Sequence, residues 1–221
     1  AVVERALALP EAAPVREDAD EQGFVAPPAT LFSAGPPLAC RDLAEREVTD
    51  LFGNELREIE REGGQLHSFF TGANRHVVLA AKEGAVLRPH GQILRTGDAL
   101  VPDEASLTST AWMSGVFHSM VTQGHVSINR FLSTTHSYLG LFRSHGQRIF
   151  IEVVDGWQLL DAPSAFEMDP SGCRWIYQHA GGRIEVRSRA GVSSHELRLE
   201  IEVVDGAPCR FLVSSHVALG G

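Results

Sequence analysis

The sequence predicts an all-β, mainly antiparallel protein, because it combines one clearly alternating strand with repeated hairpin signals. Apolar and charged residues alternate over 196–203, which gives a strand with one apolar face and one charged face. An Asp-Gly pair, which two-residue hairpin turns favour, follows a strand-like run at 155–156 and again at 205–206. We therefore expect a β-sandwich, preceded by an irregular N-terminal arm and one short helix. The apolar face would carry Leu197, Leu199, Ile201 and Val203, opposite Glu196, Arg198, Glu200 and Glu202.

The composition is that of an ordinary globular protein. The 221 residues suffice for one sandwich-type domain or two small ones, with 43% hydrophobic and 21% charged residues. The net charge of -9 argues against a nucleic-acid partner, which would require a basic face. Charged residues interrupt the first nine positions, so no signal peptide is predicted, and no apolar run approaches the roughly 18 residues of a membrane span. We expect a soluble cytoplasmic protein.

Composition divides the chain into three parts. Residues 1–40 are rich in Ala, Pro and acids, which is typical of a linker or a surface arm. Residues 41–64 form a connector with a candidate helix from 42 to 62, whose apolar residues fall loosely at helical spacing before Gly63-Gly64. Residues 65–221 form the β-sandwich domain, truncated at its C-terminal end. Because the chain lacks an initial Met and ends directly after a strand-like run, we expect a piece of a larger protein.

Strand signals follow one another through this third part. A short apolar run begins at His76, and the run 147–153 leads through Asp155-Gly156 into 157–160. Two further runs flank a Gly181-Gly182 turn, and the alternating strand is expected to turn at Asp205-Gly206 into a last one. The predicted strands are therefore 76–80, 147–153, 157–160, 173–179, 183–189, 196–203 and 209–217.

The hexapeptide Ile-Glu-Val-Val-Asp-Gly occurs twice, at 151–156 and at 201–206. The simpler interpretation is two antiparallel strands that enter the same kind of hairpin turn. A repeated structural unit is the alternative, but two copies of six residues do not establish one.

The three cysteines, Cys40, Cys173 and Cys209, are odd in number and form no CxxC pair. We interpret them as reduced thiols, with Cys173 and Cys209 inside strands. A disulfide between these two is the alternative.

The stretch 107–148 is rich in hydroxyl, amide, histidine and aromatic side chains and almost free of acids. Sugar-binding sites favour this chemistry, because aromatic faces stack on pyranose C–H groups while amide and guanidinium groups bond paired hydroxyls. The alternative is a set of core aromatics and turn-forming polar residues in a β-rich fold. The candidates for a substrate rim or an interface are Trp112, His118, Asn129, Arg130, Gln147 and Arg148.

Other kinds of catalytic or metal site have weak support. The histidines of this stretch, His118, His125, His136 and His145, lack the spacing of a helical zinc site, so no metal is predicted. Two carboxylate pairs, Asp103 with Glu104 and Glu167 with Asp169, could serve glycoside hydrolysis. The simpler interpretation makes both of them solvated turn acids. The sequence contains no GxSxG, GxxxxGK[ST] or GxGxxG motif.

Four blocks of this sequence resemble one family. They are STAWMSGVFHS at 109–119, NRFLST at 129–134, GQRIF at 146–150 and PSAFEM at 163–168. They are similar to the N-terminal part of large bacterial glycoside phosphorylases, the cellobiose-phosphorylase-like enzymes formerly called glycosyltransferase family 36. Within that family they resemble the β-1,2-oligoglucan phosphorylase branch. The resemblance covers about residues 105–219.

The resemblance implies a β-sandwich of the super-sandwich, mutarotase-like type, which precedes a helical linker and a helical barrel. The barrel of such enzymes holds the general acid and the phosphate site, so no catalytic residue is carried over to this chain. It implies a parent enzyme that cleaves a β-glucan oligosaccharide with inorganic phosphate as co-substrate and needs no cofactor. The sandwich would contact the C-terminal catalytic domain, support a homodimer and shape the rim of the glucan site.

Two rival functions remain open at the level of sequence. A free-standing carbohydrate-binding module would use the polar-aromatic stretch without any catalytic partner. A self-sufficient small hydrolase would use Glu167 or Asp103. The length of the encoding gene separates them, because the phosphorylase hypothesis requires several hundred helix-rich residues after Gly221.

Overall fold

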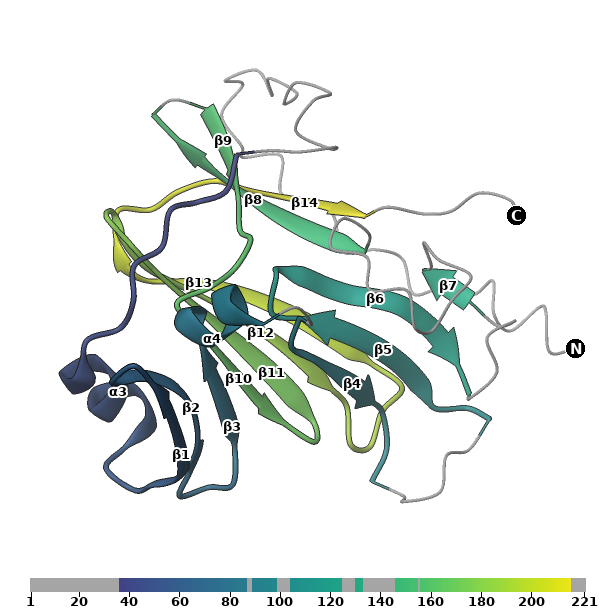
Figure 1. The fold of residues 1–221 in the computed structure, drawn as a ribbon. Helices are drawn as coiled ribbons and strands as arrows, with labels where there is room; N and C mark the ends of the chain where they lie inside the picture. The colour runs from purple at the N-terminus through teal and green to yellow at the C-terminus, as the bar shows by residue number, and fades with distance from the viewer. Residues whose placement is uncertain are drawn as a thin grey trace, which may run out of the picture.

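A computed structural model of the chain describes residues 36–86, 89–98, 104–124, 130–132, 146–154 and 156–215. These residues form two seven-stranded, antiparallel sheets that lie one over the other (Figure 1). The predicted all-β sandwich is therefore confirmed. No helix among the described residues is long and apolar enough to cross a membrane.

The first sheet has the strand order β1-β2-β3-β10-β11-β12-β13. Neighbouring strands are mostly consecutive in the chain, and the exception is β3, which pairs with β10. The strands are β1 (Leu56–Glu62), β2 (Gln65–Thr71), β3 (His76–Leu79), β10 (Ala165–Asp169), β11 (Gly172–His179), β12 (Gly182–Ala190) and β13 (Leu197–Gly206).

The second sheet has the order β14-β8-β6-β5-β4, with β7 beside β6 and β9 beside β8. The pairing of β8 with β9 confirms the hairpin predicted around 155–156. The strands are β4 (Gly91–Arg95), β5 (Leu107–Trp112), β6 (Val116–Gln123), β7 (Arg130–Leu132), β8 (Gln147–Val153), β9 (Gly156–Leu159) and β14 (Phe211–Ser215).

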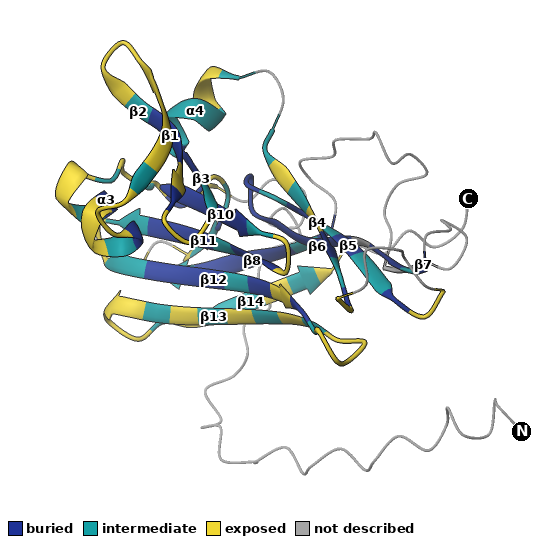
Figure 2. Ribbon diagram, turned by 90° about the horizontal axis from the view of Figure 1, so that it is seen from below, coloured by how far each residue is buried: buried dark blue, intermediate teal, exposed yellow. Residues whose placement is uncertain are grey.

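The core lies between the two sheets. Inward-facing residues of both sheets form one cluster around the fully buried Trp175, with Phe117 against its edge at a ring distance of 4.7 Å. Burial of this apolar surface is the main force that holds the sheets together. Figure 2 shows the buried strands in the middle of the molecule and the exposed β1 and β13 at its margins.

Strand β13 confirms the predicted alternation. Its even-numbered residues from Arg198 to Glu202 are exposed, and its odd-numbered residues from Leu197 to Val203 are half-buried. Leu197, Leu199 and Ile201 pack against the core cluster. β13 is the last strand of its sheet, so its charged face and its edge both contact solvent. Charged side chains on an edge strand disfavour pairing with a strand of another molecule.

The hairpin predicted at Asp205-Gly206 is wrong. Both residues remain in β13, opposite Arg183 and Gly182 of β12, and β14 pairs with β8 of the other sheet. A side chain on Gly206 would place its Cβ 2.2 Å from the carbonyl oxygen of Gly181, so glycine serves close backbone packing here. The two copies of the hexapeptide therefore have different structures.

The helix predicted over 42–62 is correct only in its first half. Helix α3 (Glu45–Phe52) ends where Gly53 adopts a φ of 83° and donates its N–H to the carbonyl of Thr49. Residues 56–62 form β1 instead, because Gly63 and Gly64, both at positive φ, turn the chain back into β2. A second short helix, α4 (Ala80–Ala85), follows β3 and was not predicted.

Helix α3 covers the outer face of the first sheet. Its Val48 and Phe52 pack with Phe69, Val77 and neighbouring residues into a second, smaller apolar cluster. The predicted arm is described from Pro36 onward, where Leu38 is buried and backbone bridges reach β9 and β11. The remainder of the arm lies outside the described residues.

All three cysteines are free thiols. Cys173 lies in β11, as predicted, and burial raises the pKa of its thiol well above the ordinary value. Cys209 does not lie in a strand, because β13 ends at Gly206 and β14 begins at Phe211.

Candidate functional site

Trp112 lies on the outer face of the second sheet. Its neighbours Ala111 and Met113 are fully buried, so the alternation of β5 directs Trp112 to the opposite side, where it is half-buried. The indole rests on Gly91 of β4, and a Cβ at Gly91 would approach the ring to 2.3 Å. Glycine is therefore required beneath this ring. Trp112 is therefore not part of the core cluster between the sheets, whereas Phe117 of the same stretch is.

Hydroxyl groups accompany Trp112 on this face. Thr110 of β5 donates its hydroxyl to the main-chain carbonyl of Ser119 over 2.9 Å, and Ile93 of β4 leaves 65% of its surface exposed. An aromatic ring beside an exposed aliphatic side chain and half-buried hydroxyl groups offers both stacking and hydrogen bonding. We call Ile93, Thr108, Thr110 and Trp112 the Trp112 face.

His118 lies between the two sheets instead of on a surface. Thr110 pairs with Ser119 and Trp112 with Val116, so both Phe117 and His118 of β6 lie opposite Ala111 in a β-bulge. The bulge gives His118 a φ of 39° and buries its side chain. This strained backbone directs the imidazole toward the first sheet.

The imidazole of His118 bonds to both sheets. Its Nε2 lies 3.0 Å from Ser188 Oγ of β12 and 3.3 Å from the carbonyl oxygen of Arg198. Its Nδ1 lies 3.4 Å from Ser109 Oγ of β5. Burial lowers the pKa of His118, and the hydrogen bond to the Arg198 carbonyl opposes that shift only in part. This geometry makes His118 a structural link between the sheets.

Arg148 is also a buried structural residue. Its guanidinium donates to the carbonyl oxygen of Ser114 over 3.1 Å and lies 3.3 Å from Asp161 Oδ1. Burial lowers the pKa of Arg148, while Asp161 favours the charged form. The neighbouring Gln147 is half-buried, and its Oε1 accepts no hydrogen bond from the described residues.

The six predicted rim residues do not share one surface. Trp112 faces outward, whereas His118 and Arg148 are buried within the sandwich. Arg130 opens β7, but its side chain and the whole of Asn129 lie outside the description. Of these six, Trp112 has the geometry of a residue that could contact a ligand.

Glu167 is not a solvated turn acid. It lies in the middle of β10 with an exposed fraction of 6%, and its carboxylate contacts Arg174 Nε at 2.7 Å and Arg75 at 3.5 Å. A further ion pair on the outer face of the same sheet joins Glu185 to Arg187 at 2.5 Å. Two guanidinium groups hold the Glu167 carboxylate, so it is not free to serve as a catalytic acid.

The second acid of this pair has a local role. Asp169 Oδ1 accepts hydrogen bonds from the main-chain N–H and the hydroxyl of Ser171 in the turn after β10. Asp103 lies outside the described residues, and Glu104 is exposed beside it. Glu167 and Asp169 are therefore both engaged by neighbouring groups, and the pair Asp103 with Glu104 stays a prediction.

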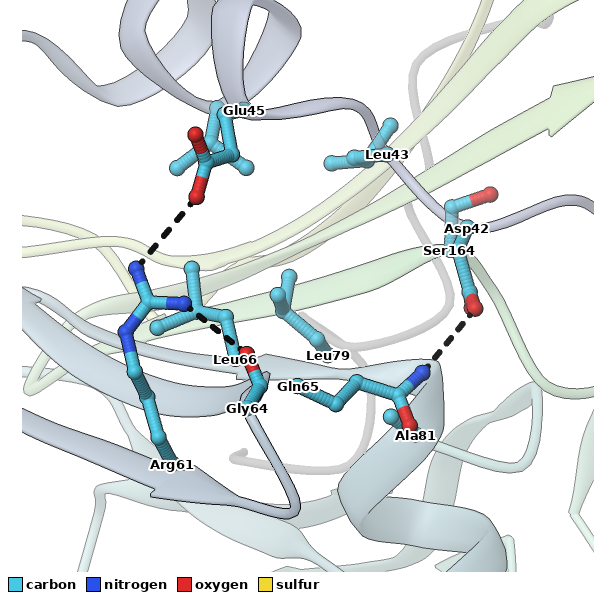
Figure 3. A pocket seen from close by; sticks show the side chains of 11 residues that line it. Asp42, Leu43, Glu45, Arg61, Gly64, Gln65, Leu66, Leu79, Ala81 and Ser164 are labelled. Carbon is cyan, nitrogen blue, oxygen red and sulfur yellow. Dashed lines mark hydrogen bonds and ion pairs between the residues drawn. The ribbon is translucent and has the colours of Figure 1, made fainter.

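A pocket of about 240 Å³ opens between α3, the β1–β2 turn and α4 (Figure 3). We call it the α3 pocket. Its floor is aliphatic and its walls are polar, with Glu45 facing Arg61 on one side and Asp42 facing Gln65 on the other. The lining residues are Asp42, Leu43, Glu45, Val48, Arg61, Gly64, Gln65, Leu66, Leu79, Ala81 and Ser164.

The family profile of the glycoside phosphorylase supersandwich domain matches residues 54–221. The chain belongs to this family. It is also 30% identical over 186 residues to a 1,2-beta-oligoglucan phosphorylase of Listeria innocua serovar 6a. That alignment covers 84% of the chain and 17% of the relative, so the chain spans less than a fifth of that enzyme's length.

The match confirms the resemblance inferred from the sequence blocks, and it begins earlier than they do. A start at residue 54 takes β1 and β2 of the first sheet into the supersandwich domain. Helix α3, which precedes the matched region, closes the α3 pocket over these two strands. No sequence motif marks this pocket, because its residues come from four separate segments.

Proposed function

We propose that this chain is the non-catalytic supersandwich region of a glycoside phosphorylase that acts on β-glucan oligosaccharides. The observation that carries the proposal is the family match over 54–221, together with the identity to an enzyme named for oligoglucan phosphorolysis. In such a reaction an oxygen of inorganic phosphate attacks the anomeric carbon and the glycosidic oxygen leaves with a proton. The product is a sugar 1-phosphate.

A non-catalytic role agrees with the state of the acids in the sandwich. Phosphorolysis requires a general acid that can protonate the leaving oxygen. Glu167, the most buried candidate, is fixed by Arg174 and Arg75 on the outer sheet face. The general acid and the phosphate site would be supplied by a C-terminal helical domain of the same longer protein. The protein would be cytoplasmic and would use phosphate as co-substrate without a further cofactor.

The supersandwich domain would contribute surfaces to this enzyme. The Trp112 face combines a half-buried indole with the half-buried Thr108 and Thr110 and the exposed Ile93, which is the chemistry of a sugar-binding surface. We propose that it borders the glucan site or a contact between the subunits of a homodimer. Both roles require Trp112 to affect function more than folding.

The test is an assay of the longer protein that contains this chain. Purified protein is incubated with a β-1,2-linked glucan oligosaccharide, with and without inorganic phosphate, and its mass in solution is measured. The proposal requires phosphate-dependent release of glucose 1-phosphate and the mass of a dimer. A gene that ends near Gly221, or a product that binds oligosaccharide without cleaving it, would instead identify a free-standing carbohydrate-binding module.

A further inference from the structure

We propose that the α3 pocket binds one glucosyl unit of a β-glucan chain. The inference rests on the proposed function for the identity of the sugar, and on the geometry of the pocket for the class of ligand. The pocket lies on the outer side of the first sheet, on the face that α3 covers.

Two polar pairs form the opposite walls of the pocket, and each pair joins the β1–β2 hairpin to the α3 segment. Arg61 lies 3.6 Å from Glu45, and the side-chain amide of Gln65 donates to Asp42 Oδ2 over 3.2 Å. Each wall therefore presents a donor next to an acceptor. A hydroxyl group both donates and accepts, so adjacent donors and acceptors suit a polyhydroxylated ligand.

The charge of the pocket disfavours anionic ligands. Its charged lining groups are the carboxylates of Asp42 and Glu45 and the guanidinium of Arg61, which leaves a net charge of -1. A negative pocket disfavours phosphate and other anions. No group of three or more metal-ligating side chains is found in the described part of the chain, and both carboxylates are already paired. A neutral ligand rich in hydroxyls fits best.

The floor and the size of the pocket point to a single pyranose ring. Leu66 and Leu79 lie between the two polar walls (Figure 3), and they offer an aliphatic surface to the C–H face of a sugar. The volume of about 240 Å³ is below the roughly 300–1,000 Å³ of pockets for drug-sized ligands. One sugar unit would therefore fill the pocket, while the rest of the glucan extends into solvent.

The β1–β2 turn holds one wall in position before any ligand binds. Gly63 and Gly64 adopt φ values of 57° and 84°, and Arg61 donates from Nη1 to the carbonyl oxygen of Gly64 over 3.2 Å. This bond restrains the guanidinium beside the pocket. Restraint of a long side chain in the free protein reduces the entropy that binding costs.

Two variants test the site by different means. Ala81→Phe fills the pocket from α4 and leaves both polar pairs in place, and Gln65→Leu removes the amide of one wall. Gln65 is exposed, so its replacement does not disturb the core. Arg46→Ala is the matched control, because Arg46 is an exposed residue of α3 that does not line the pocket.

The measurement is the number of β-1,2-glucan oligosaccharides bound per chain, titrated on the longer protein with thermal midpoint and phosphorolysis recorded in parallel. We expect Ala81→Phe and Gln65→Leu to bind one oligosaccharide fewer per chain than wild type and Arg46→Ala, with turnover at saturating substrate unchanged. Equal stoichiometry in all four proteins, with phosphorolysis intact, overturns the pocket assignment and leaves the proposed function standing. Absence of both phosphorolysis and oligosaccharide binding in wild type rejects the proposed function together with this inference.

Discussion

The indole N–H of Trp175 donates a 3.0 Å hydrogen bond to the main-chain carbonyl of Trp112. The donor belongs to β11 of the first sheet and the acceptor to β5 of the second, so this bond joins the two layers inside the core. Trp175 is fully buried, and its ring also contacts Phe117 and Phe166 at 4.7 and 4.9 Å. It is the central aromatic residue of the sandwich.

We expect Trp175→Ala to lower the free energy of unfolding by about 3–5 kcal/mol, because it leaves a large cavity. Trp175→Phe keeps an aromatic ring but removes the hydrogen-bond donor to the Trp112 carbonyl. It should therefore lower the free energy of unfolding by about 1–3 kcal/mol. Urea unfolding followed by circular dichroism gives both values. A Trp175→Phe protein as stable as wild type would show that the hydrogen bond between the sheets contributes nothing.

The half-buried Trp112 should matter less to folding than Trp175. We expect Trp112→Ala to cost about 1–3 kcal/mol of stability, since only part of its surface leaves water on folding. In the proposed phosphorylase, the same variant should raise the Michaelis constant for the oligosaccharide or change the oligomer mass. A large loss of midpoint with unchanged kinetics and mass would assign Trp112 to the scaffold alone.

A double-mutant cycle tests the contact beneath this ring. Gly91→Ala places a methyl group against the indole of Trp112 and should destabilise the wild-type protein. In the Trp112→Ala background the methyl group has space, so the same change should be close to neutral. An equal cost of Gly91→Ala in both backgrounds would mean that the ring does not rest on this glycine.

The alternation of β13 predicts unequal effects at adjacent positions. Leu199 packs against the core and Arg198 is exposed with Glu196 as its partner, so Leu199→Asp should cost several kcal/mol and Arg198→Ala about 0.5 kcal/mol or less. Urea midpoints measured side by side provide the comparison. Equal shifts in the two variants would contradict the register of β13.

His118 should make the stability of the domain depend on pH. Burial lowers its pKa from 6.5 in the folded state, so the unfolded chain binds the proton more readily. Stability that depends on neutral His118 is complete above pH 6.5 and is lost as the pH falls through the lower pKa of the folded state.

The measurement compares urea midpoints between pH 5 and pH 8 for wild type, His118→Asn and His195→Asn. Asparagine tolerates the positive φ of position 118 and does not titrate. His195 is exposed, so its replacement serves as the control. The loss of stability at low pH should shrink in His118→Asn and persist in His195→Asn. An unchanged pH profile in His118→Asn would contradict this role.

The local pattern of the sequence predicts seven of the fourteen described strands, and the seven not predicted are β1, β2, β4, β5, β6, β7 and β10. β13 and the β8–β9 hairpin follow from such patterns. The second hexapeptide shows the limit of local patterns. Whether Asp205 and Gly206 form a turn or extend the strand depends on the partner strand. Here β12 extends far enough to pair with both residues.

The arrangement of the site was less predictable, for two physical reasons. The bulge at His118 changes the register between β5 and β6, so a residue expected on a surface enters the space between the sheets. The α3 pocket joins residues far apart in the chain, such as Asp42 and Ser164, which no spacing rule connects. Glu167 likewise gains its partner Arg174 through cross-strand pairing.

We propose that this chain is the non-catalytic domain of a β-glucan phosphorylase. The most direct test compares the 221-residue chain, shown to be folded by circular dichroism and cooperative thermal unfolding, with the longer protein that contains it. Each is incubated with a β-1,2-linked oligosaccharide and inorganic phosphate. We predict glucose 1-phosphate from the longer protein and none from the folded chain above a heat-killed control. Release of glucose 1-phosphate or reducing sugar by the folded chain alone would contradict the claim.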